Sequence, residues 1–207
     1  MAYYKTNRGI LVEEYDDVIN PRKVYDHFTT FLTFARNYVS PDKNKFKSYD
    51  ELVISFGGDE ADRIYRKEGI GAGNDYLIKV MDKKGYFALP VYKFEHTGIS
   101  YEAAMRNPYN CPFDSCLIGI IYASKKDIRK EYQTKRITSK IKTKVLELMK
   151  AEVKEYSSYS NGEVYYYRLL DDLEEIDACG GFIGDIAENG VLDTFDITEY
   201  EYIGEKI

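Results

Sequence analysis

The sequence predicts an α+β fold in which a mostly antiparallel sheet packs with one long helix, in a single compact domain. Two observations lead to this prediction. The chain has 207 residues, 44% of them hydrophobic and 31% charged, which is ordinary for a globular protein with a sizeable core. Its C-terminal half has the order strand, helix, helix, strand, strand, and this order favours an α+β architecture.

The N-terminal part is predicted to contain two strands. Residues 9–13 (GILVE) form a short strand, and Asn20-Pro21 marks a turn after it. Residues 28–39 are apolar and aromatic, and their length and content of Thr and Phe favour a strand over a short helix.

Two helices are predicted to follow these strands. Ser48 and Glu51 have the three-residue spacing of a capping box, which begins a helix that continues through residues 59–67. A second helix, over residues 74–83, ends near Gly85.

The middle of the chain is predicted to be rich in strands. Residues 86–95 form one strand, in which Pro90 indicates an edge position or a bulge. Residues 117–123 (LIGIIYA) form a buried strand. Ser124 then caps a short helix, with Asp127 near the positive end of that helix.

The longest predicted helix begins at Ser139 and stops at Asn161-Gly162. Its apolar residues recur at helical spacing and form a stripe typical of a helix packed on a core: Ile141, Val145, Leu148, Met149, Val153 and Tyr156.

A hairpin and a last strand complete the predicted fold. Residues 164–170 and 176–182 pair across the acidic turn 171–175, and a strand lies near residues 200–203. We therefore expect an α+β domain over residues 1–184, with residues 185–207 as an acidic C-terminal extension packed on it or trailing from it.

Composition and cysteine use indicate a cytoplasmic protein. No apolar run approaches the roughly 20 residues that span a bilayer, and the N-terminus lacks the apolar segment of a secretory signal. The three cysteines, Cys111, Cys116 and Cys179, are an odd number, which argues against a disulfide framework and suits a reducing compartment. We expect no association with a membrane.

The chain is rich in tyrosine, with 21 Tyr and no Trp. An AT-rich genome explains this usage, because its codons favour Tyr, Lys and Ile. A surface suited to binding other proteins is the alternative, since Tyr is enriched at interfaces. Both explanations can hold together.

Charge is distributed in blocks behind the formal net charge of −6. Residues 125–154 carry 11 basic and 4 acidic side chains, and residues 155–207 carry 14 acidic and 2 basic ones. The basic block could contact nucleic acid, or it could solvate the outer face of a packed helix. The acidic block could imitate a phosphate backbone, or it could serve solubility and pairing within the fold.

Candidate catalytic residues are concentrated between residues 94 and 116. If the protein is an enzyme, Cys111 with His96 and Asp114 is the candidate set, because a base next to a thiol promotes the thiolate. A cysteine at the start of a buried strand is more often a small core residue, so no catalytic residue is favoured. Cys111, Cys116 and His96 are too few and too irregularly spaced for a structural zinc site, so we expect no metal and no cofactor.

The same stretch resembles a family of uncharacterised proteins from phages and mobile elements. The family's runs tyrosine-aspartate-histidine-serine-glycine and cysteine-proline-tryptophan-aspartate-serine-glycine correspond to residues 94–98 (FEHTG) and 111–116 (CPFDSC). The following strand corresponds to residues 120–122 (IIY), and the resemblance spans residues 13–184.

The sequence departs from the family pattern in two ways, at the tryptophan positions and at a histidine position. Tryptophan is absent where the family has it, and Ala35 stands in place of an upstream histidine. The resemblance implies an origin in phages or mobile elements and carries no known activity.

We therefore expect an accessory protein that inhibits a host defence system, of the anti-CRISPR or anti-restriction type, in the host cell cytosol. Its partner is expected to be a host defence protein or nuclease complex. Binding is predicted to use five carboxylates of the acidic turn, which imitate phosphates: Asp171, Asp172, Glu174, Glu175 and Asp177. The alternatives are a Cys/His-dependent hydrolase or transferase, and a nucleic-acid-binding module using residues 125–154. The net charge of −6 makes direct binding of nucleic acid the least favoured.

Overall fold

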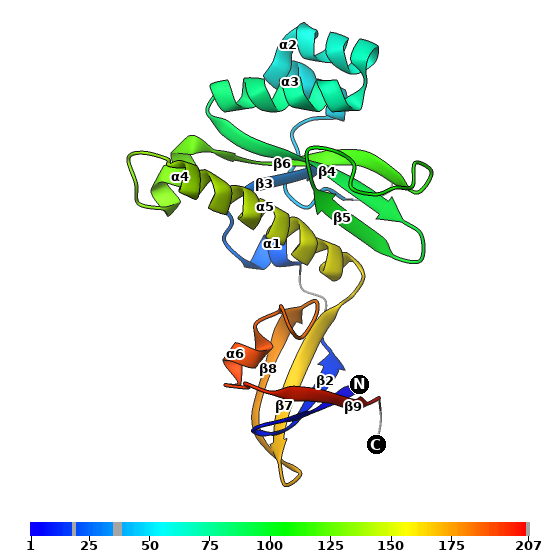
Figure 1. Ribbon diagram of the computed structural model, residues 1–207, viewed down its shortest axis with the longest axis vertical. Coiled ribbons are helices and arrows are strands. Elements are labelled where there is room, and N and C mark those ends of the chain that lie inside the picture. The colour runs from blue at the N-terminus through cyan, green and yellow to red at the C-terminus, as the bar shows by residue number, and fades with distance from the viewer. Residues whose placement is uncertain (18–19, 35–38, 206–207) are drawn as a thin grey trace. The chain divides into compact units, whose positions relative to one another are not determined.

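The computed structural model describes residues 1–17, 20–34 and 39–205 (Figure 1). Helices and strands both contribute, and all strand pairs within the described residues are antiparallel. The predicted α+β class with mostly antiparallel sheets is therefore confirmed.

The chain folds into two compact units. Unit 1 comprises Met1–Val24 and Ser158–Ile207, and unit 2 comprises Tyr25–Ser157. The chain therefore begins and ends in unit 1. The boundary that we expected between residues 184 and 185 lies inside unit 1, and neither crossing between the units occurs there.

Unit 1 is built on a five-stranded sheet with the order β8-β7-β2-β1-β9. Its strands are β1 (Ala2–Thr6), β2 (Gly9–Tyr15), β7 (Val164–Asp171), β8 (Glu174–Ile183) and β9 (Tyr200–Gly204). Two short helices, α1 (Pro21–Val24) and α6 (Val191–Thr194), complete the unit.

The core of unit 1 joins the two ends of the chain. Leu11, Tyr167 and Leu169 from the sheet pack with residues that follow β8, namely Ile186, Val191, Phe195 and Ile197. Burial of these side chains is the main stabilising contribution to this unit. The C-terminal residues thus form part of the core, and β9 extends the sheet beside β1.

Tyrosines of unit 1 form an aromatic cluster around a carboxylate. Tyr165 and Phe182 contact the ring of Tyr167 at centroid distances of 6.3 and 5.4 Å. The hydroxyl of Tyr167 donates to Glu13 Oε2 at 2.6 Å, and that of Tyr4 donates to the same oxygen at 3.4 Å. Part of the tyrosine excess is therefore used inside the fold.

Unit 2 is built on a four-stranded sheet with the order β3-β6-β4-β5. Its strands are β3 (Thr30–Thr33), β4 (Tyr86–Glu95), β5 (Ile99–Ala103) and β6 (Ser115–Ser124). Its helices are α2 (Tyr49–Glu68), α3 (Ile70–Lys83), α4 (Lys125–Glu131) and most of α5 (Ser139–Ser160). Figure 1 shows α2 and α3 on one face of the sheet and α5 across the other.

Both faces of this sheet are packed. On one face Leu32, Ala88 and Ile120 form a core with residues of α2 and α3: Leu52, Val53, Ala61, Leu77 and Met81. On the other face the ring of Phe31 contacts Tyr156 of α5 at 5.4 Å. The predicted stripe of α5 is buried at Val145, Met149, Val153 and Tyr156.

One buried charge interrupts the apolar stripe of α5. Glu152 is only 7% exposed. Its carboxylate lies 3.3 Å from His27 Nδ1 and accepts a hydrogen bond from the hydroxyl of Thr29. Partners of this kind are needed, because a buried charge without them is strongly destabilising.

Two helix starts follow from local sequence as predicted. Ser48 Oγ accepts from the amide of Glu51 at 3.1 Å, and Ser124 Oγ accepts from the amide of Asp127 at 3.0 Å. The return contact of the first capping box differs from the standard form, because Glu51 Oε2 accepts from the amide of Lys47 at 2.7 Å.

Of the two alternatives predicted for Pro90, an edge position is wrong, whereas a bulge or similar irregularity lies directly after it. β4 lies between β6 and β5, and its register with β6 shifts between Val91 and Tyr92. The carbonyl of Pro90 accepts from the amide of Ala104, just beyond the end of β5. The proline nitrogen lies on that same side of the strand, opposite Ala104, so the missing N–H falls at the end of β5 and not between β4 and β6.

Other differences concern short elements. β1 and β5 were not expected. β1 (AYYKT) has no clear apolar alternation, whereas β5 (ISYEA) does alternate but is only five residues long. The strand predicted over residues 28–39 is observed only as β3, and residues 35–38, which include Ala35, lie outside the described residues.

Candidate functional site

His96, Cys111 and Asp114 come together at one end of β4 and β6. His96 follows β4, and Asp114 precedes β6. The amide of Glu95 donates to the carbonyl of Asp114 at 2.9 Å, which joins the two strand ends. Cys111 Sγ donates to Asp114 Oδ2 at 3.2 Å, and His96 Nδ1 lies 3.6 Å from the same oxygen.

The order of these groups differs from that of a cysteine nucleophile with its base. The carboxylate of Asp114 lies next to the thiol, whereas nucleophilic catalysis needs the imidazole in that place. The loop is also held by its own contacts, since Ser115 Oγ donates to the carbonyl of Cys111 at 2.5 Å. This geometry favours a structural role for the three residues, which stays a prediction.

A groove of about 540 Å³ lies elsewhere on unit 2. It is lined by Phe34, Lys47, Ser48, Tyr49, Asp50, Lys93, Cys116, Leu117 and Ile118. None of His96, Cys111 and Asp114 lines this groove.

Residues 1–17, 20–34 and 39–205 contain neither a cluster of metal-ligating side chains nor a membrane-spanning helix. Within these ranges no group of three or more His, Cys, Asp and Glu side chains is arranged to hold a metal ion. No helix there is both long and apolar enough to cross a membrane. Cys111, Cys116 and Cys179 are free thiols.

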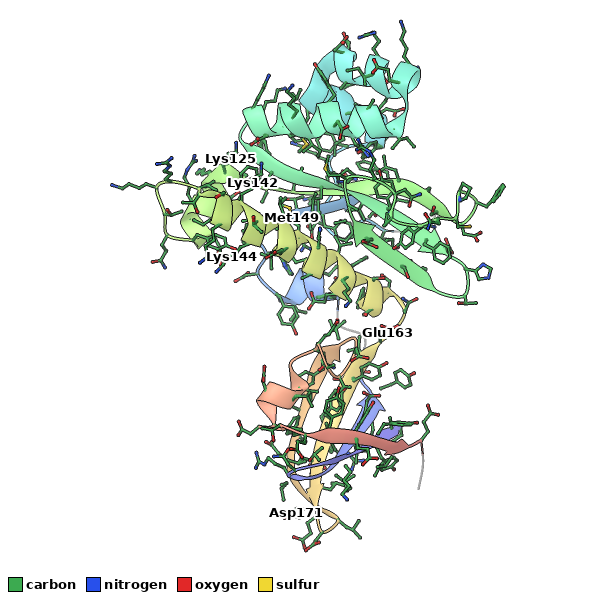
Figure 2. The ribbon with its side chains drawn as sticks, in the orientation of Figure 1. Lys125, Lys142, Lys144, Met149, Glu163 and Asp171 are labelled. Atoms are coloured by element: carbon green, nitrogen blue, oxygen red, sulfur yellow. The ribbon has the colours of Figure 1, made fainter. Side chains whose placement is uncertain are left out.

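The predicted acidic turn forms the end of the β7–β8 hairpin. We call Asp171, Asp172, Glu174, Glu175 and Asp177 the acidic tip. All five side chains are exposed, and Figure 2 labels Asp171 at the far end of the hairpin. Within the described part of the chain, the acidic tip has one ion pair, between Glu175 and Arg168 at 3.8 Å. Arg168 is shared with Glu14 at 2.5 Å.

The sequence analysis missed Leu173, which lies between the carboxylates. Asp171 pairs with Glu174, so Asp172 and Leu173 form a two-residue turn. Both have positive φ, 44° and 71°, and Leu173 is 89% exposed. Such turns favour Asn-Gly or Asp-Gly. The sequence does contain a signal for this site, namely a leucine at the turn position that usually holds glycine. Such a leucine brings backbone strain and an exposed apolar group to the same place.

The charge blocks of the sequence belong to different units. Unit 1 contains 6 basic and 17 acidic residues, net −11, whereas unit 2 contains 23 basic and 18 acidic residues, net +5. The net charge of −6 is therefore an average over two units of opposite sign.

Comparison with known protein families, curated proteins and solved structures gives no match. The candidate sites are therefore judged from their own geometry.

Proposed function

We propose that the protein is a phage or mobile-element accessory protein that inhibits a host defence system, of the anti-CRISPR or anti-restriction type. On this proposal it binds a defence protein in the host cytosol and occupies a groove that normally holds nucleic acid. The observation that carries the proposal is the acidic tip on an exposed hairpin. The resemblance of residues 13–184 to phage and mobile-element proteins supports the context.

The acidic tip concentrates negative charge that the hairpin itself does not use. Asp171 and Glu174 lie directly opposite each other in the ladder, and like charges in that position destabilise a hairpin. A basic groove would relieve this repulsion. Duplex DNA carries one negative charge per roughly 1.7 Å of axis, so a groove that binds it can also accept closely spaced carboxylates.

Leu173 gives the tip a second kind of contact. Its side chain projects among the carboxylates and is 89% exposed. Burying it in a partner would add apolar contact in the middle of a charged rim, which is the usual arrangement of a protein interface. Charge would then govern the rate of association and its dependence on salt.

Phage plating on hosts with one defined restriction or CRISPR nuclease each tests the proposal. The tip variant changes Asp171, Asp172 and Asp177 to Asn and Glu174 and Glu175 to Gln. The control variant makes the same kind of change at five exposed acids of unit 1: Asp17, Asp193, Glu199, Glu201 and Glu205. Both variants have a formal net charge of −1, so they differ only in where the charge is lost.

The native chain and the control variant should protect the phage against at least one nuclease, and the tip variant should not. Pull-down of that nuclease should weaken with salt for the native chain. Protection by none of the chains overturns the proposal, and equal loss in both variants removes the role of the acidic tip. A folded Cys111→Ala variant without protection would instead favour the alternative of a cysteine enzyme.

A further inference from the structure

We infer that unit 2 carries a separate binding surface for the phosphate backbone of double-stranded nucleic acid, formed by α4, the loop after it and the start of α5. We call it the basic surface. It extends from Lys125 to Lys144 and contains 9 basic and 2 acidic residues. Figure 2 labels Lys125, Lys142 and Lys144 on this part of the unit.

The first part of the basic surface is α4. Lys126, Arg129 and Lys130 are exposed, and none of them has an ion pair among the residues that the structure describes. Asp127, whose carboxylate accepts from Ser124 Oγ at 2.5 Å in the helix cap, keeps its charge and offsets part of theirs. Lys126 and Lys130 are four residues apart, a spacing at which like charges destabilise a helix.

The second part is the beginning of α5. Its first turn contains no acidic residue, although acids are the side chains that stabilise a helix N-terminus. Lys140 and Lys144 are exposed and again four residues apart. The backbone amides and the lysines therefore add positive charge in the same place, which suits a phosphate group.

Asp82 marks one border of the basic surface. Lys125 lies 2.5 Å and Lys142 lies 4.0 Å from its carboxylate oxygens. Both ammonium groups also lie about 5 Å from the ring centroid of Phe87. These two lysines are used within the fold, so the exposed residues beyond them are the ones available to a ligand.

On the exposed side of α2, another helix of unit 2, basic side chains are paired with acidic ones. Arg63 bonds to Glu60, with Nε 2.7 Å from Oε2, and Arg66 bonds to Asp62 at 2.9 Å. A helix face that only needs to be solvated normally mixes the two signs in this way. Solvation alone therefore does not account for nine basic residues against two acidic ones on the basic surface.

The side chains of the basic surface favour backbone contacts over stacked bases. Tyr132, the tyrosine between α4 and α5, is half-buried and packs on Phe28 at a centroid distance of 6.3 Å. A ring that is half-buried in this way is a poorer stacking platform for an unpaired base than a fully exposed one. Lysine and arginine contacts to phosphates suit a duplex and carry no sequence preference.

Fluorescence anisotropy of the full chain with labelled duplexes tests the inference. The surface variant changes Arg129, Lys130, Lys140 and Lys144 to Gln. The control variant changes Lys43, Lys67, Lys79 and Lys150, four exposed lysines of the same unit, to Gln. Both variants have a formal net charge of −10. Circular dichroism checks that each chain is folded.

The native chain should bind, and contact with four phosphates would weaken its affinity about 100-fold between about 50 and 200 mM salt. The surface variant should lose most of this affinity, and its slope of log affinity against log salt should fall by about one for each contact removed. The control variant should stay close to the native chain. DNA and RNA duplexes are compared in parallel arms, and binding in either arm supports the inference.

Three outcomes would overturn it. The first is that the native chain binds neither duplex at low salt. The second is that the two variants lose affinity equally, and the third is that the chain binds vesicles of anionic lipid and no duplex. Loss of duplex binding in the surface variant with phage protection intact would separate this surface from the acidic tip.

Discussion

Each of the two units contains its own antiparallel sheet, but the units differ in net charge and in how far helices cover the sheet. Unit 1 has a net charge of −11 and exposes most of its edge strand β8, whereas unit 2 has a net charge of +5 and packs helices on both faces of its sheet. An average over the whole chain hides this contrast. It teaches that partners must be inferred for each unit separately, because a ligand responds to the local field.

The edges of unit 1 suggest a second use for its acids. β8 carries three of the acidic-tip residues, Glu174, Glu175 and Asp177, and β9 carries Glu201. Charges on edge strands prevent pairing with other chains. The five-acid control variant of unit 1 removes Glu201, so self-association in either variant reveals this use and can be distinguished from loss of partner binding.

The largest effects are expected from two glycines that lie against the neighbouring strand. A Cβ on Gly119 would lie 2.0 Å from the carbonyl oxygen of Leu32 in unit 2, and one on Gly9 would lie 2.1 Å from that of Leu170 in unit 1. Because a backbone atom cannot easily move away, each change to Ala should cost about 3 kcal/mol of unfolding free energy.

Hydrogen exchange of each variant then tests whether the units are independent. Gly119→Ala should reduce amide protection in β3, β4 and β6, and Gly9→Ala should reduce it in β1, β2 and β7. Gly71→Ala is the control, since its Cβ would meet only ordinary contacts at 3.5 Å or more. Loss of protection in both units from either variant would mean that the chain unfolds as one cooperative unit.

A smaller effect, confined to unit 2, is expected at Glu152. Glu152→Ala leaves His27 and Thr29 without this buried acceptor and should destabilise the protein by about 2 kcal/mol. Glu147→Ala on the exposed side of α5 is the control and should change stability by less than about 0.5 kcal/mol. Denaturant titration measures both. Equal effects would show that the buried contacts contribute no more than exposed ones.

Local signals predicted much of this fold. The caps at Ser48 and Ser124 are set by side chains three residues from the amides they bind, so the sequence alone reveals them. β4 was predicted with its observed limits because its apolar run is long. The acidic hairpin was predicted because both flanking strands and their polar turn are continuous in sequence.

Long-range pairing explains what the sequence did not reveal. β1 pairs with β2, which follows it in sequence, and also with β9, almost 200 residues away, and nothing in its own residues specifies that distant partner. The division into two units depends on this closure. Leu173 was missed for a different reason, since its importance comes from its exposure and positive φ rather than from its residue type.

Alkaline pH should reveal a more modest difference between the units. Burial raises the pKa of Tyr165 in unit 1 and of Tyr65 in unit 2 to about 12. Since the folded pKa exceeds the ordinary value of 10, the folded state holds these protons more tightly. The resulting stabilisation is complete below pH 10 and is lost as pH rises toward about 12, in both units.

Glu13 distinguishes the units in this range. Burial raises the pKa of Tyr165 most, and the negative charge of Glu13 raises it next. Within the described residues, no carboxylate contributes to the raised pKa of Tyr65. Glu13→Gln should therefore weaken the alkaline pH dependence of unit 1 and leave that of unit 2 unchanged. Phenolate absorbance and hydrogen exchange across the pH series measure this. An unchanged titration would contradict the role of Glu13.

The smallest expected change in stability is at Leu173, and it bears most directly on function. Glycine accepts the positive φ of 71° without the strain that leucine has, although it loses more backbone entropy on folding. No buried contact is lost, because Leu173 is 89% exposed. Leu173→Gly should therefore stabilise unit 1 by about 0.5 kcal/mol.

The same change should weaken phage protection if Leu173 contacts the partner. Leu173→Asn is the matched variant, since asparagine also tolerates positive φ and adds a polar group. A gain in stability with a loss of protection in both variants would mean that the strained leucine serves binding at the expense of folding. Intact protection in both would restrict the interface to the carboxylates, and a loss of stability in Leu173→Gly would show that the turn is not strained.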